Sequence, residues 1–131
     1  MRVAALIALL ATVGCGAATS APTPGPSGAT ELRITYWPQG RGAGPVEKWT
    51  LRCKPPAGTL PWAASACRKL ETMRDPFAPI PPDAMCTELY GGPQVALVTG
   101  TFRGRALRAQ LARRNGCEIS RFDRLRFLVP G

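Results

Sequence analysis

The sequence predicts an α+β domain in which an antiparallel sheet carries one main helix. Three observations lead to this class. Several segments alternate apolar and polar residues with the period of two that is typical of half-buried strands. One segment near residue 66 instead has apolar residues four apart, which favours a helix. Glycine and proline number 14 each, so turns must separate short elements, and this order of strands and helices is typical of the α+β class.

The strands are expected as two hairpins and one short final segment. In residues 30–37, Leu32, Ile34 and Tyr36 alternate with polar side chains, and residues 46–53 alternate in the same way. The glycine-rich turn at 40–45 makes these two segments a hairpin pair. Residues 95–102 and 107–111, joined by a turn at 103–105, predict a second hairpin. Residues 127–129 predict a short final strand.

The main helix is expected over residues 61–73. Thr59 can cap it and Pro61 suits its first turn. Trp62, Ala66 and Leu70 fall four apart and place Cys67 on the buried face. A short helix is expected over 117–125. Residues 75–83 contain four prolines, which exclude a regular element and predict a loop.

The first 20 residues have the pattern of an export signal. A positive start precedes an apolar run over residues 3–13 that is too short for a membrane span, which needs about 20 residues. Residues 12–15 resemble a bacterial lipobox, in which the cysteine, here Cys15, is lipidated. Ordinary cleavage near residues 17–21 is the alternative. We therefore expect a targeting segment over 1–20, a Pro/Gly/Ser linker over 21–29 and a domain over 30–131, secreted or lipid-anchored at the cell surface.

Four cysteines remain when Cys15 is set aside: Cys53, Cys67, Cys86 and Cys117. An even number in an exported domain indicates two disulfides, for which three pairings exist. Free buried thiols are the alternative. A zinc site is not expected, because the chain has no histidine and no Cys-x-x-Cys pair. We expect no other metal and no cofactor.

Composition argues against an enzyme. Without histidine the chain can form neither a Ser-His-Asp triad nor a Cys-His pair, and only eight acidic residues are available. The formal charge is +9, and eight arginines lie between residues 103 and 126. An anionic partner is one interpretation of this stretch, and a solvated basic face is the other. Export and the lack of a stacking aromatic cluster argue against nucleic acid as the partner.

Several motifs resemble the bacterial subtilisin-inhibitor-like family of serine protease inhibitors. They occur in the family's order and spacing. They are Cys53-Lys54-Pro55-Pro56-Ala57-Gly58-Thr59-Leu60-Pro61, Ala64-Ser65-Ala66-Cys67, Met85-Cys86-Thr87-Glu88-Leu89-Tyr90-Gly91-Gly92-Pro93, Val98-Thr99-Gly100-Thr101-Phe102-Arg103-Gly104 and Asn115-Gly116-Cys117-Glu118-Ile119. The resemblance implies a five-stranded antiparallel sheet with two helices. It also implies the disulfide pairs Cys53–Cys67 and Cys86–Cys117, and a homodimer formed through the sheet.

The resemblance further implies inhibition of an extracellular serine protease, either subtilisin-like or glutamate-preferring. In the family, the second residue after the loop cysteine fills the specificity pocket of the protease. That residue is Glu88 here, so the implied reactive bond is Glu88–Leu89. Thr87, Cys86 and Met85 would contact the protease on the acyl side of this bond, and Tyr90 would follow Leu89 on the leaving-group side.

Two departures from the family pattern affect this expectation. Gly91-Gly92-Pro93 replaces the usual Asp-Pro, which is expected to weaken one support of the loop. Glu88 is unusual, because burying an unpaired carboxylate in an apolar pocket is costly. Alternatively, Glu88 is a solvated carboxylate without a role, and Met85 and Tyr90 serve packing.

A second class of function stays open at this point. The same scaffold could be a surface-tethered, non-inhibitory binding module with an Arg-rich contact face. Arg121 and Arg124 do not flank the loop in sequence, so we expect their replacement to have little influence on inhibition.

Overall fold

The computed structural model describes Gly14, Gly16 and residues 28–130. Cys15 and the predicted linker up to residue 27 lie outside the described residues. The elements follow the order β1 (Thr30–Trp37), β2 (Glu47–Cys53), α1 (Ala63–Thr72), β3 (Val95–Phe102), β4 (Arg105–Leu111), α2 (Gly116–Arg124) and a 3-10 helix, η1 (Arg126–Leu128). This is the predicted α+β class.

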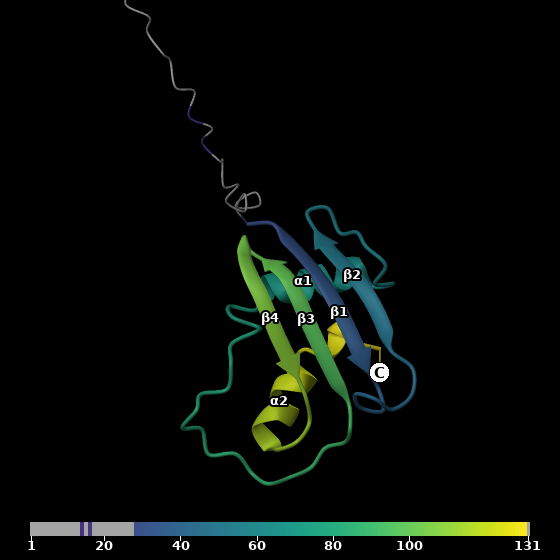
Figure 1. Cartoon of the computed structure of the whole chain (residues 1–131), viewed down its shortest axis with the longest axis vertical. Coiled ribbons are helices and arrows are strands. Elements are labelled where there is room, and N and C mark those ends of the chain that lie inside the picture. Colours follow the sequence, from purple (N-terminus) through teal and green to yellow (C-terminus); the bar gives the residue numbers. More distant parts are fainter. Residues whose placement is uncertain (1–13, 15, 17–27, 131) are drawn as a thin grey trace, which may run out of the picture.

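The four strands form one antiparallel sheet in the order β2-β1-β3-β4 (Figure 1). Both predicted hairpins are confirmed, because β1 pairs with β2 and β3 pairs with β4. β1 also pairs with β3, with Ile34 opposite Val98. The alternation of the sequence gives the sheet one apolar face, on which Leu32, Ile34, Leu51 and Val98 are buried.

The helices and the C-terminal residues cover this apolar face and leave the other face open (Figure 1). Ala66, Cys67 and Leu70 form the buried side of α1, as their spacing predicted. Cys53 at the end of β2 is bonded to Cys67, with a Cα–Cα distance of 5.7 Å. The disulfide therefore joins the edge of the sheet to the main helix.

The expectation of five strands is wrong, since the described residues form a four-stranded sheet. The predicted final strand at 127–129 falls in and after the 3-10 helix η1. The amides of Leu128 and Val129 donate to the carbonyls three residues earlier, at 2.9 and 3.1 Å. These two consecutive side chains are both buried, whereas neighbours on a strand point to opposite faces. The helical turn allows both to enter the core.

Arg103, in the turn between β3 and β4, adopts a positive φ of 50°. Its guanidinium donates hydrogen bonds to the carbonyls of Leu70, Met73 and Arg74 at 2.7 to 2.8 Å. The carbonyls of Leu70 and Met73 belong to the last turn and the C-cap of α1 and carry the partial negative charge of the helix C-terminus, and that of Arg74 follows directly. Arg103 thus fixes the end of α1 to the sheet, just before the long loop begins.

Candidate functional site: an exposed loop fixed at both ends

The long connection between α1 and β3, residues 73–94, contains no helix or strand. It leaves the end of α1, swings out from the domain and returns past α2 to β3 (Figure 1). Its prolines account for the irregular course, since each lacks a backbone donor and has a fixed φ. Ala84 donates to the carbonyl of Pro81 at 3.0 Å, which makes a turn before the segment 85–90.

Segment 85–90 presents its side chains to solvent. Met85 is 98% exposed, Leu89 63% and Tyr90 65%. Among the described residues, only Val46 is a further large hydrophobic side chain with such exposure. A monomeric domain gains nothing from exposing three large apolar side chains in one short segment, so their clustering points to a contact surface for a partner. The expectation that Met85 and Tyr90 serve packing is therefore not supported.

Three connections fix this segment, on both sides of the Glu88–Leu89 bond. Cys86 is bonded to Cys117 at the start of α2, with a Cα–Cα distance of 5.3 Å. The Gly116 amide donates to the Thr87 carbonyl at 2.9 Å. A Cβ at residue 116 would overlap the Thr87 side chain, so glycine allows this close approach. Both disulfide pairs implied by the family resemblance are present.

The third connection lies beyond Tyr90 and involves Arg113. The Gly91 amide donates to the Arg113 carbonyl at 2.8 Å, and the Arg113 Nε donates to the Gly91 carbonyl at 2.9 Å. A Cβ at Gly91 would lie 2.7 Å from Ile119 Cδ1. Gly91 therefore replaces the usual aspartate without leaving the loop unsupported, because Arg113 holds both of its backbone groups.

Arg113 is itself held in place by α2. It forms an ion pair with Asp123 and lies over the Phe122 ring, 5.2 Å from its centroid. Its side chain is only 15% exposed. A guanidinium with partners on several sides has few alternative rotamers, so its hydrogen bond to the loop is preorganised.

The N-terminus of α2, to which the loop is attached, is capped by side chains. The Asn115 side chain accepts from the Glu118 amide at 3.0 Å. The Glu118 carboxylate in turn accepts from the Arg114 amide at 3.1 Å and pairs with the Arg114 guanidinium at 2.6 Å. Hydrogen bonds from Arg114 lower the pKa of Glu118, and the same pair raises the pKa of Arg114. The residues that bind the loop thus belong to an ordered helix start.

Arg121 supports the other end of the connection. It donates hydrogen bonds to the carbonyls of Phe77, Ala78 and Gln110 at 2.8 to 3.0 Å. Burial lowers the pKa of this guanidinium. Sequence distance had suggested that Arg121 has little influence on the loop. The structure instead joins the start of the loop to β4 through this side chain.

The arginine-rich stretch 103–126 is therefore not a continuous basic surface. Arg103, Arg113 and Arg121 donate to backbone carbonyls, and Arg113 and Arg114 are in ion pairs. These four of the eight arginines hold the fold together, so the stretch as a whole is not a contact face, whereas the other four, Arg105, Arg108, Arg124 and Arg126, are exposed. The sequence could not predict these hydrogen bonds, because every residue has a backbone carbonyl, and the fold alone decides which carbonyl an arginine reaches.

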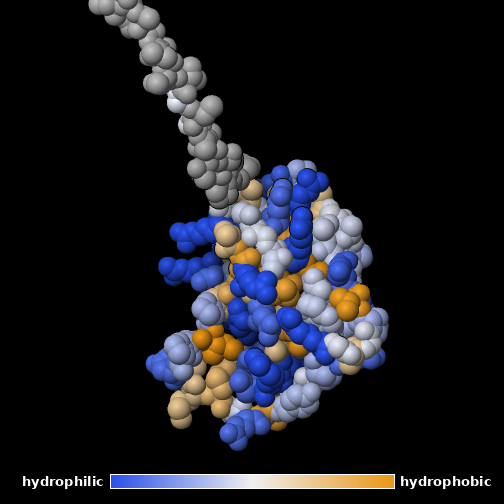
Figure 2. Space-filling model, in the orientation of Figure 1, coloured by the Kyte–Doolittle hydropathy of each residue, from blue (hydrophilic) through white to orange (hydrophobic). Residues whose placement is uncertain are grey.

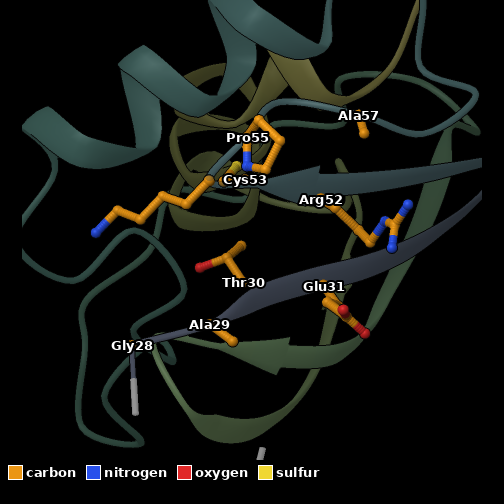
Figure 3. Close-up of a pocket in the computed structure, with 9 residues that line it drawn as sticks. Gly28, Ala29, Thr30, Glu31, Arg52, Cys53, Pro55 and Ala57 are labelled. Atoms are coloured by element: carbon orange, nitrogen blue, oxygen red, sulfur yellow. The ribbon is translucent and has the colours of Figure 1, made fainter. Parts of the chain in front are cut away.

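The described part of the chain contains neither a metal site nor a membrane-spanning helix. Residues 28–130 contain no cluster of three potential metal ligands, and none of their helices is long and apolar enough to span a membrane. A hollow at the far end of β1 is lined by Gly28–Glu31, Arg52–Pro55 and Ala57 (Figure 3). It lies at the start of β1, whereas the loop returns to β3 beside Trp37 at the other end of β1. The hollow therefore does not belong to segment 85–90.

The subtilisin inhibitor-like family model matches residues 28–115, which include β1 to β4 and the whole loop. The chain belongs to this family. Its members are inhibitors and not enzymes, in agreement with the composition. Among solved structures, the chain is similar to sermetstatin of Streptomyces caespitosus, which was solved in complex with Bacillus licheniformis subtilisin. The two sequences are 24% identical, and the TM-score is 0.45. The match covers 71% of this chain and 90% of sermetstatin. No curated protein sequence matches the chain.

Proposed function

We propose that this subtilisin inhibitor-like protein inhibits a serine protease by presenting Glu88–Leu89 as a substrate-like bond. One observation carries the proposal. The segment that exposes Met85, Leu89 and Tyr90 is held on both sides of the bond. Immediately before the bond, Cys86 and Thr87 fix it to the start of α2, and shortly after the bond, Gly91 is bound to Arg113.

The inhibitory mechanism follows from this fixation. The segment would enter the active-site cleft in an extended form and add a strand to the edge of the protease by backbone hydrogen bonds. Met85, Cys86 and Thr87 would lie on the acyl side, with Leu89 and Tyr90 on the leaving-group side. After cleavage the acyl-side end would stay attached to α2, and the leaving-group-side end would stay attached to Arg113. The new termini would therefore remain close, and the bond could re-form. A preorganised loop also loses little entropy on binding, which favours high affinity.

Glu88 would set the specificity. Its side chain is exposed and makes no hydrogen bond or ion pair with residues 28–130, so it is free to enter a pocket. Transfer of a carboxylate into an apolar pocket is unfavourable unless a cation there forms a charge-assisted hydrogen bond. The best target is therefore an extracellular serine protease that prefers glutamate, and a subtilisin-like enzyme is the second choice.

A protease panel tests this function. The purified domain is incubated with subtilisin and with a glutamate-specific serine protease, and residual activity is measured against inhibitor concentration. We expect stoichiometric inhibition of the glutamate-specific enzyme. The variant Glu88→Met should shift the preference towards subtilisin by at least tenfold, because an apolar side chain suits its pocket.

Asp83→Met is the matched control, since it removes another exposed carboxylate of the same loop. It should leave the profile unchanged. Equal profiles for the wild type and Glu88→Met would show that Glu88 is not the specificity residue. Failure of both forms to inhibit any protease in the panel would refute the inhibitory function.

We also propose that the protein acts outside the cell. The predicted targeting segment and the two disulfides of the domain support export to an oxidising compartment. Lipidation at Cys15 would tether the domain through the linker, and two or more acyl chains would make the attachment stable. Mass spectrometry of the mature protein tests the anchor, and an unmodified N-terminus beyond Cys15 would contradict it.

A further inference from the structure

The open face of the sheet is strongly basic. The register places Arg33 beside Thr50 and Thr99, and Thr99 beside Arg108. The next rows add Lys48 and Arg52, and Arg41 lies over Trp37 on the same face. We call this surface the basic sheet face. Its members are Arg33, Arg41, Lys48, Arg52 and Arg108, with Thr35, Thr50, Thr99 and Thr101 between them and Glu31 as its single carboxylate.

These cations are available for a partner. Within residues 28–130, ion pairs form only at Arg113–Asp123 and Arg114–Glu118, outside this face. Arg33, Lys48, Arg52 and Arg108 are exposed. Arg41 is positioned by its contact with the Trp37 ring, 4.5 Å from the centroid, and by a hydrogen bond to Gln110 of 2.9 Å. Figure 2 shows the hydrophilic side chains gathered over the sheet on this side of the molecule.

The shape and charge of the face fit an extended anionic surface. Three of the four strands carry cations, with Arg33 on β1, Lys48 and Arg52 on β2 and Arg108 on β4. Neighbouring strands lie about 5 Å apart, so the face can contact several anions at once. Threonine hydroxyls between the cations can donate hydrogen bonds to phosphate oxygens. Layers of anionic phospholipid headgroups present such groups in two dimensions, and each nearby Lys or Arg strengthens the attraction to them.

The position of the chain's N-terminal segment favours a membrane over a soluble polymer. Twelve residues, 16–27, separate Cys15 from Gly28, which lies two residues before the start of β1 at Thr30 in this same sheet. Such a segment spans at most about 45 Å. If Cys15 is anchored as proposed above, the basic sheet face is confined near the headgroups, which raises their effective concentration.

We propose that the basic sheet face docks the domain onto an anionic phospholipid membrane. The reactive segment is fixed to α2, outside this face. Docking therefore orients the inhibitor on the surface and leaves Glu88–Leu89 accessible to a protease. The charge argument does not depend on inhibition, and only the choice of a membrane rests on the proposed anchor.

Vesicle co-sedimentation tests the proposal with the chain from residue 16 onward, which lacks the lipid and contains the whole core and both disulfides. Binding is measured for phosphatidylglycerol/phosphatidylcholine vesicles and for pure phosphatidylcholine vesicles, in low salt. We expect binding to the anionic vesicles only, and its loss in high salt. The double variant Arg33→Gln/Arg108→Gln should weaken the binding about 30-fold.

Arg68→Gln/Arg124→Gln is the matched control, because it removes the same charge from exposed helical positions. It should weaken the binding much less. An equal loss in both double variants would show that only net charge matters and would overturn the proposal. So would a dimer in analytical ultracentrifugation that Arg33→Gln/Arg108→Gln dissociates without any vesicle binding. Because protease inhibition is measured separately, its failure cannot be confused with failure of docking.

Discussion

Replacing Arg113 by methionine removes one support of the loop while leaving the other connections intact. The backbone carbonyl of residue 113 still accepts from the Gly91 amide, and the Cys86–Cys117 disulfide remains. What is lost is the hydrogen bond from the guanidinium to the Gly91 carbonyl and the pair with Asp123. The guanidinium contact with the Phe122 ring is lost as well, while methionine keeps an unbranched apolar side chain in its place.

The magnitude can be worked from these contacts. A hydrogen bond that involves a charged group contributes about 1.5–3 kcal/mol. The pair with Asp123 adds little, because that carboxylate is about half exposed at 47% and exposed ion pairs contribute less than about 1 kcal/mol. We therefore expect the fixed state of the loop to lose about 2 kcal/mol, which weakens protease binding about 30-fold.

The assay combines two measurements. The inhibition constant is determined for the wild type and Arg113→Met against the protease that the wild type inhibits best. Mass spectrometry then follows cleavage of Glu88–Leu89 with time, which should be faster in the variant because the new termini separate more easily. Arg114→Met is the control, since Arg114 is 67% exposed and its side chain pairs with Glu118 and not with the loop.

The reasoning would be refuted by one clear result. If Arg113→Met and Arg114→Met have the same inhibition constant and the same cleavage rate as the wild type, the guanidinium does not support the loop. Urea denaturation of both variants shows whether any change is confined to the loop, because a local effect leaves the midpoint of global unfolding nearly unchanged.

Three further predictions follow from the same contacts. Arg121→Met should lower the free energy of unfolding by about 3 kcal/mol through the loss of three hydrogen bonds to carbonyls, and Arg124→Met by less than about 0.5 kcal/mol; equal urea midpoints would contradict this. Glu118→Gln should destabilise the domain at neutral pH but not in strong acid, because the folded-state pKa of Glu118 is lowered and its contribution is lost as the pH falls through that value; a pH-independent difference in thermal unfolding would oppose it. Cys86→Ala/Cys117→Ala should cost about 4 kcal/mol in the chain-entropy model for a separation of 31 residues, and an unchanged denaturation curve would exclude that estimate.

The strands could be predicted from the sequence because their side chains have a strict period of two. Leu32, Ile34 and Tyr36 alternate with polar residues over eight positions, and the register buries all three. The same criterion failed at 127–129, where three residues are too few to distinguish a strand from a helical turn. Leu128 and Val129 are apolar because both enter the core, which is a property of the turn and its surroundings.

The candidate site was predictable only in part. The cysteine count indicated two disulfides, but their pairing came from the family resemblance, since four cysteines allow three pairings. Residues 85–90 were found through the same resemblance. Arg113 and Arg121 were not found, because their partners are the carbonyls of Gly91, Phe77 and Ala78, and a backbone acceptor leaves no trace in the residue type.

The attachment of the loop has a consequence for how the protein can change over evolutionary time. Glu88, Leu89 and Tyr90 touch no part of the buried core, while the residues that hold their segment lie on α2 and just before it. Substitutions at these exposed positions therefore cost little folding stability. Selection can then act on the choice of target protease almost independently of selection on the fold, and a lineage of such inhibitors can follow a changing protease by exchanging single side chains.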